Sequence, residues 1–96
     1  MPDRTHQNRE APAPPSRVDV RQKLEGLLSG AVTRDEANSW AMQWVAARDP
    51  GVDDRAVWQA LNALGMADSP TTDRQWLFEE VDFRAWLAEF EAACSD

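Results

Sequence analysis

Apolar residues recur at three- and four-residue intervals in four stretches of this chain, and this spacing predicts four amphipathic helices. The clearest stretch covers residues 33–47, where Thr33 and Glu36 form the pattern of a capping box at a helix start. One face of this stretch is apolar and consists of Ala37, Trp40, Ala41, Trp44 and Val45. We expect the helix to stop near Arg48, ahead of a Pro-Gly turn, and the other helices to pack around its two indoles.

The other three helices are predicted over residues 17–29, from 53 or 54 to 64, and from 80–82 to 93. Ser16 is the expected N-cap of the first helix, and Gly30 is placed to close it in the left-handed conformation. Gly65 occupies the corresponding position after the third helix, where we expect a Schellman cap with Met66 contacting Leu61.

An exposed loop is predicted over residues 68–74, which are rich in turn-forming side chains. The short apolar run 76–78 follows, and its periodicity fits an extended segment as well as one helical turn. We expect these side chains to close one end of the core. Because no second strand pattern exists, the sequence predicts an all-α, compact four-helix domain over residues 17–96.

Residues 1–16 are polar and then proline-rich, which predicts a disordered N-terminal tail. Its APAPP run could also serve as a ligand for an aromatic groove, although a tail is the simpler interpretation. Through Arg17 the tail holds three arginines against two acids, a net charge of +1. The remaining 79 residues therefore carry −8.

The whole chain has 10 basic and 17 acidic residues, a net charge of −7, which is opposite in sign to a nucleic-acid-binding footprint. We therefore expect no nucleic-acid partner and no membrane partner. A helix-turn-helix was considered, but the link between the second and third predicted helices exceeds the usual three- or four-residue turn. An acidic domain suits a basic protein partner, or is kept soluble by its charge.

Candidate groups for catalysis are few. His6 lies in the predicted tail, Cys94 lies near the C-terminus among acidic residues, and no zinc-type spacing or glycine-rich phosphate loop is present. Paired carboxylates occur at predicted helix starts, where the helix dipole favours them. We therefore predict no catalytic, cofactor or metal site and no enzymatic activity. One cysteine, no signal-peptide pattern and no long apolar run indicate a cytoplasmic protein.

The aromatic residues at helical spacing fit a hydrophobic core better than a binding site. Trp76 is the candidate exception, because it borders the exposed loop and is flanked by charge. More than half of the domain's negative charge follows residue 72. We therefore predict a partner-binding site formed by Trp76, Glu79, Glu80 and Asp82.

The spacing of small and aromatic residues over residues 20–90 also resembles a family of small, acidic, uncharacterised bacterial all-helical proteins. The positions that carry the resemblance are Ser29-Gly30, Thr33-Arg34-Asp35-Glu36, Trp40-Ala41, Trp44, Val57-Trp58, Ala60-Leu61, Ala67-Asp68, Asp82-Phe83 and Trp86-Leu87. Some acidic helical proteins of this size are immunity proteins that neutralise a toxin, and the resemblance implies no active-site residue.

The function expected from the sequence is an acidic protein-binding module without catalytic activity, of an immunity or inhibitory type. Acidic side chains would attract a basic protein, and an aromatic anchor would be buried in the contact. The alternative is a structural or assembly protein that forms a homodimer through a leftover apolar helix face.

Overall fold

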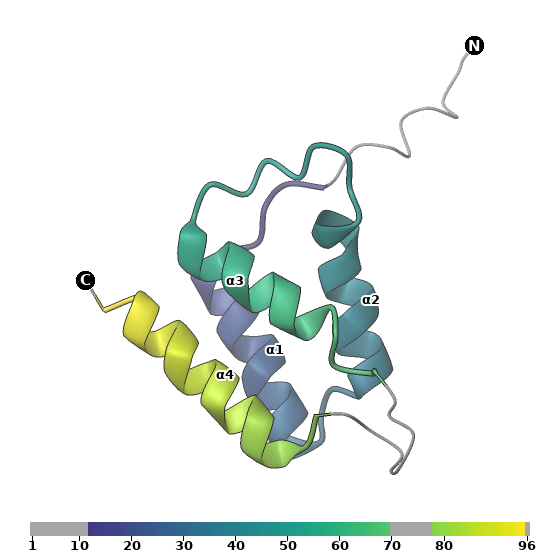
Figure 1. Cartoon of the computed structure of the whole chain (residues 1–96), viewed down its shortest axis with the longest axis vertical. Helices are drawn as coiled ribbons and strands as arrows, with labels where there is room; N and C mark the ends of the chain where they lie inside the picture. The colour runs from purple at the N-terminus through teal and green to yellow at the C-terminus, as the bar shows by residue number, and fades with distance from the viewer. Residues whose placement is uncertain (1–11, 70–77, 96) are drawn as a thin grey trace.

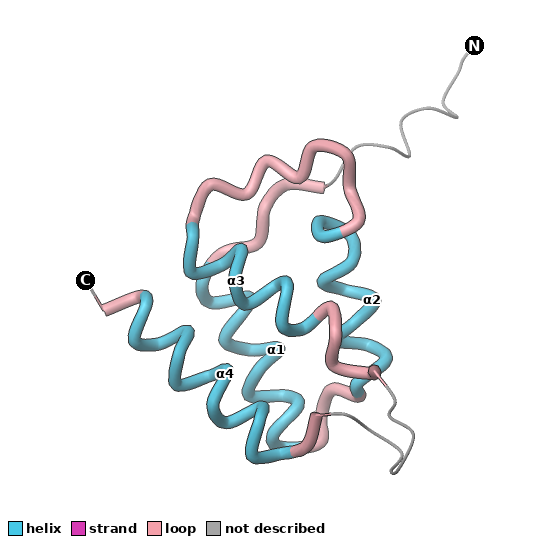
Figure 2. Tube along the Cα trace, in the orientation of Figure 1, coloured by secondary structure: helices cyan, strands magenta, loops and turns pink. Residues whose placement is uncertain are grey.

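The computed structural model describes residues 12–69 and 78–95, and within them it contains four helices and no strand (Figures 1 and 2). The helices are α1 (Arg17–Ser29), α2 (Arg34–Val45), α3 (Arg55–Leu64) and α4 (Glu80–Ala93). The predicted all-α class is therefore confirmed. Among the described helices, none is both long enough and apolar enough to cross a bilayer. The predicted tail falls largely on residues 1–11, which lie outside the described residues.

Local capping chemistry sets both ends of α1, as predicted. The Ser16 hydroxyl accepts from the Asp19 N–H at 3.1 Å, and the Asp19 carboxylate accepts from the Ser16 N–H at 3.0 Å. At the other end Gly30 has φ +89°, a conformation that is open to glycine at little cost. The N–H groups of Gly30 and Val32 both donate to the Gly26 carbonyl, and this closes a tight turn into α2.

Helix α2 begins with the predicted capping box between Thr33 and Glu36, whose two hydrogen bonds measure 3.0 and 2.9 Å. Its end was predicted wrongly, because the helix stops at Val45 and not near Arg48. The Ala47 N–H donates to the Trp44 carbonyl only three residues back, so the last turn tightens and the chain leaves the helix axis.

The arrangement of the helices also differs from the prediction that the others pack around α2. Helices α1 and α3 each pack against all three others, whereas the backbones of α2 and α4 do not approach each other within the described residues. Arg34 at the start of α2 nevertheless reaches the Phe83 ring of α4. Figure 1 shows α2 and α4 on opposite sides, with α1 and α3 between them. The largest fully buried side chains are accordingly on α1 and α3: Leu24, Leu61, Leu64, Val20 and Val57.

The predicted Schellman cap at Gly65 is absent. Gly65 has φ −65° and ψ −10°, and Met66, which is 48% exposed, and Ala67 continue the chain in tight turns with N–H bonds three residues back. The Gly65 carbonyl accepts a hydrogen bond from the side-chain amide of Asn38 on α2. This tertiary contact holds the right-handed conformation, and the local sequence carries no sign of it.

Aromatic rings close the end of the core where α4 begins. The Phe78 and Trp86 rings lie 5.0 Å apart and the Phe83 and Trp86 rings 5.2 Å apart, both in tilted arrangements. The expectation that the 76–78 run closes this end is met by Phe78. Residues 76 and 77, and the predicted loop after residue 69, lie outside the described residues.

Candidate functional site

The predicted partner-binding site lies at the start of α4. Trp76 is outside the described residues. The Glu79 N–H donates to the Asp82 carboxylate at 2.8 Å, and Glu80 forms an ion pair with Arg84 one turn later. Glu80 and Asp82 therefore have local roles at a helix N-terminus, where the helix dipole also favours negative charge. The Glu79 carboxylate instead lies 3.5 Å from the Arg34 guanidinium of α2.

The distribution of charge along the chain is more informative than its total. Residues 1–48 hold seven basic and six acidic side chains, a net charge of +1, whereas residues 49–96 hold three basic and eleven acidic side chains, a net charge of −8. Charge asymmetry between the halves of a chain is a sign of a charged partner. Because α2 and α4 lie on opposite sides of the domain, the fold partly separates these charges in space.

Beyond the first turn of α2, the surface on the side of this helix is poor in acidic side chains, as is that of α3. From residue 37 to residue 48 the chain has no acidic side chain, and Arg48 ends this stretch. The residues that we call the α2 face are exposed along this helix and just beyond it: Ser39, Met42, Gln43, Ala46 and Arg48. Asp35 and Glu36 limit this face at its N-terminal end, and the Glu36 carboxylate is occupied by the capping box.

Lys23 of α1 borders the α2 face. Its ammonium group lies 5.3 Å from the centre of the Trp40 ring, which packs edge-on against Trp44 at 5.1 Å. Among the described residues, neither Lys23 nor Arg48 has a carboxylate within ion-pair distance. These two cations are therefore available to an anionic partner.

Two further cations of the domain, Arg17 and Arg34, are held in structural contacts. Arg17 bonds the Asp54 carboxylate at 2.7 Å, and this hydrogen bond lowers the pKa of Asp54 below its ordinary value. The Arg34 guanidinium donates to the Phe78 carbonyl at 2.7 Å. The Asp54 carboxylate also caps α3, because it accepts from the N–H groups of two residues in the first turn of that helix. The contact between Arg17 and Asp54 therefore ties the starts of α1 and α3 together.

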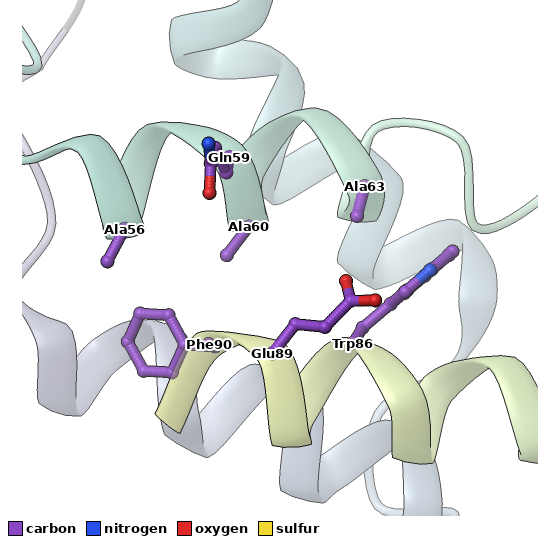
Figure 3. Close-up of a pocket in the computed structure, with 7 residues that line it drawn as sticks. All are labelled: Ala56, Gln59, Ala60, Ala63, Trp86, Glu89 and Phe90. Atoms are coloured by element: carbon purple, nitrogen blue, oxygen red, sulfur yellow. The ribbon is translucent and has the colours of Figure 1, made fainter. Parts of the chain in front are cut away.

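A groove between α3 and α4 is too small for a substrate. Its volume is about 40 Å³, close to the space of one water molecule. Figure 3 shows alanines of α3 above Trp86 and Phe90 of α4, with the Glu89 carboxylate between the two aromatic rings. The groove results from small side chains that let two helices approach.

A larger depression of about 400 Å³ lies beside the turn between α1 and α2, bordered by Val32, Thr33, Arg34 and Phe83 among others. Its size is in the range of small-molecule sites. Two of its polar side chains have structural partners, because Thr33 caps α2 and Arg34 bonds the Phe78 carbonyl while lying 5.1 Å from the Phe83 ring. Within the described residues, no group of three or more histidines, cysteines or carboxylates is placed to hold a metal ion.

Comparison with known proteins gives a family match over most of the chain. A family model described as "YxzC DNA-binding protein" matches residues 9–90. A relative from Bacillus subtilis (strain 168), named "Uncharacterized protein YxzC", is 30% identical over 73 residues, which are 76% of this chain and 60% of the relative. The chain thus spans somewhat less than two thirds of the relative's length. No solved structure matches.

The family description corrects two predictions made from the sequence. A DNA-binding description conflicts with the predicted absence of a nucleic-acid partner, and with a protein-binding module of the immunity type or its homodimer alternative. The resemblance to a family of small bacterial proteins is confirmed, and no immunity protein appears in the comparisons. The predicted partner-binding site stays a prediction, because neither the comparisons nor the described contacts test it. Its residues are Trp76, Glu79, Glu80 and Asp82.

Proposed function

This chain belongs to the family described as YxzC DNA-binding protein, and from that membership we propose that it binds DNA in the cytoplasm, without catalytic activity. The observation that carries the proposal on this molecule is the charge asymmetry, because the near-neutral half of the chain supplies the α2 face and its two available cations. The phosphate backbone is the part of DNA that such cations contact first.

The total charge of −7 repels the phosphates of DNA, so the contact must be made by one part of the surface that is less acidic than the rest. At about 0.15 M salt, interactions between exposed charges fade beyond a Debye length of roughly 8 Å. Neighbouring helix axes are about 8–10 Å apart, and α1 and α3 lie between α2 and α4. The acids of α4 are therefore largely screened from a duplex that lies against α2.

The side chains of the α2 face suit a DNA surface. Arg48 offers a planar set of N–H donors to a phosphate, and Ser39 can hydrogen-bond a phosphate or a base edge. Gln43 donates one N–H to the Trp40 carbonyl at 3.1 Å, and its amide oxygen is an acceptor for a base amino group. The link between α2 and α3 covers residues 46–54, so the two helices do not form a helix-turn-helix with its short turn.

Replacing Arg48 or Lys23 with alanine is expected to weaken binding to a fluorescently labelled DNA duplex, measured by anisotropy over a range of salt concentrations. Each lost phosphate contact should reduce the slope of log K against log salt by about 0.9, and the affinity at about 0.15 M salt by roughly fivefold. The double variant should lose about 1.8 from the slope.

Arg84→Ala is the matched control, because Arg84 is equally a surface cation but lies on α4 and is paired with Glu80. Its affinity and slope should equal those of the native chain. The α2 face is refuted as the DNA contact if Arg84→Ala weakens binding as much as Arg48→Ala. Affinities that do not depend on salt would refute the phosphate contacts.

A further inference from the structure

The outward side of α2 carries a continuous stripe of exposed side chains. Four residues at the i, i+3, i+4 and i+7 spacing form it: Ser39, Met42, Gln43 and Ala46. The opposite side of α2 is held in the core, where Trp44 is 4% exposed and its indole N–H donates to the Pro12 carbonyl at 3.0 Å. The stripe therefore faces outward in a fixed orientation. The major groove of DNA, about 12 Å wide, admits an α-helix that approaches in this way.

The chemistry of the stripe distinguishes between base pairs. From residue 37 to residue 47 the chain has no arginine, lysine, aspartate or glutamate. In the major groove, arginine and lysine recognise guanine, and carboxylates accept from the amino group of cytosine. An amide recognises adenine, and an apolar group contacts the methyl group of thymine. The stripe offers an amide and a thioether, so it has side chains for an A·T pair and lacks those for a G·C pair.

The Gln43 amide is held ready for such a contact. One of its N–H groups donates to the Trp40 carbonyl at 3.1 Å, and no other described residue bonds this amide. The second N–H and the amide oxygen remain, and these are the donor and the acceptor that match N7 and the N6 amino group of adenine. Because one end of the amide is already fixed, less rotational freedom is lost when it binds a base.

Met42 lies beside Gln43, toward α3. Its side chain is 36% exposed, and its sulfur lies next to Gly65, at 3.3 Å from where a Cβ would stand. A flexible thioether adapts its shape to an apolar group such as the thymine methyl. The exposed glutamine of α3 is placed differently, because Gln59 borders the groove that also contains Glu89 of α4 (Figure 3). A carboxylate there would repel a duplex.

We propose that α2 enters the major groove and reads an A·T base pair there, with the Gln43 amide on adenine and Met42 on the thymine methyl group. This inference rests on the proposed DNA-binding function. Lys23 beside the stripe and Arg48 beyond its end contact phosphates and position the helix, and the stripe supplies the preference for one base pair.

The preference is tested with three labelled duplexes of equal length, measured by anisotropy at one salt concentration. They consist of alternating A·T, alternating G·C and alternating inosine·cytosine pairs. We expect the A·T duplex to bind about tenfold more tightly than the G·C duplex. Inosine·cytosine keeps the major-groove pattern of G·C but lacks the minor-groove amino group, so it should bind as weakly as G·C. Equal affinities for A·T and G·C, or inosine·cytosine binding as tight as A·T, would overturn the proposal.

Variants of Gln43 test its role in the preference. Gln43→Ala should reduce the ratio of A·T to G·C affinity from about tenfold to about twofold, with an unchanged salt slope because no phosphate contact is lost. Gln43→Arg should turn the preference toward G·C, a gain that damage to the fold could not produce. Gln59→Ala is the matched control and should keep the native ratio. A native ratio in Gln43→Ala would contradict the role of the amide.

The contact of Met42 is tested by replacing thymine with uracil, which removes only the methyl group. The native chain should bind the uracil duplex about threefold more weakly than the A·T duplex. Met42→Ala should bind the two duplexes equally, since the side chain that contacts the methyl group is gone. Equal binding of both duplexes by the native chain would show that Met42 does not read thymine.

Failure of this inference differs from failure of the proposed function. If Arg48→Ala weakens binding but the native chain binds A·T and G·C equally, the base readout is wrong and the α2 face stands as a phosphate contact. A native chain that binds none of the duplexes at low salt overturns both.

Discussion

Replacing Leu61 with alanine is expected to lower the free energy of unfolding by about 3 kcal/mol. Leu61 is 0% exposed and lies on α3, one of the two helices that contact all the others. Alanine would leave a cavity in the fully buried, close-packed interior, where little relaxation can fill it. For a domain of this size the melting temperature should fall by roughly 12–24 °C, which thermal unfolding followed by circular dichroism measures.

Met66→Ala is the control for this prediction. Met66 is a long apolar side chain close to the end of the same helix, but it is 48% exposed. Its replacement should change the unfolding free energy by about 0.5 kcal/mol or less. Equal losses for the two variants would show that α3 is not the centre of the core.

The second large effect is expected for Gly26→Ala, although alanine is the better helix former. A Cβ at position 26 would lie 2.4 Å from the Val32 Cγ2 atom and 3.0 Å from its Cβ. Val32 cannot move away easily, because its N–H and that of Gly30 are both bonded to the Gly26 carbonyl. We expect a loss of about 1–3 kcal/mol in urea unfolding, as for other overpacked positions.

Gly65→Ala provides the matched comparison. Gly65 has right-handed dihedral angles, and its added Cβ would meet the flexible end of Met42 at 3.3 Å. This variant should therefore be close to neutral. The steric argument is further tested by Gly26→Ala/Val32→Ala, which should recover part of the lost stability. If the Gly26→Ala protein is as stable as the Gly65→Ala protein, the close approach of Val32 to Gly26 is contradicted.

Features set by short-range chemistry were predictable from the sequence. The starts of α1 and α2 follow from Ser16 with Asp19 and Thr33 with Glu36, because both partners of each box lie within four residues. The conformation of Gly65 involves a hydrogen bond from Asn38, which only the folded chain brings into place. The early end of α2 accompanies the bond from the Ala47 N–H to the Trp44 carbonyl, which no capping residue in the local sequence marks. The central position of α1 and α3 likewise depends on how four amphipathic faces meet.

The candidate site was missed because charge was counted over the chain as a whole and over its tail. The total charge of −7 argued against DNA as a partner. The acid-free stretch from residue 37 to residue 48 was a signal that could have indicated the α2 face. That stretch becomes meaningful once the fold shows α2 and α4 on opposite sides, so that the acids of α4 do not face it. The bond from Trp44 to Pro12 could not be predicted, since nothing in either local sequence marks the contact.

The most direct test of DNA binding by the side of α2 is a titration of the ¹⁵N-labelled chain with a short DNA duplex, followed by NMR. The account predicts shifts in the backbone amides of Ser39, Gln43 and Arg48 that saturate with DNA, while the amides from Glu80 to Glu91 on α4 stay in place. Shifts centred on α4, or no shifts at low salt, would contradict the account.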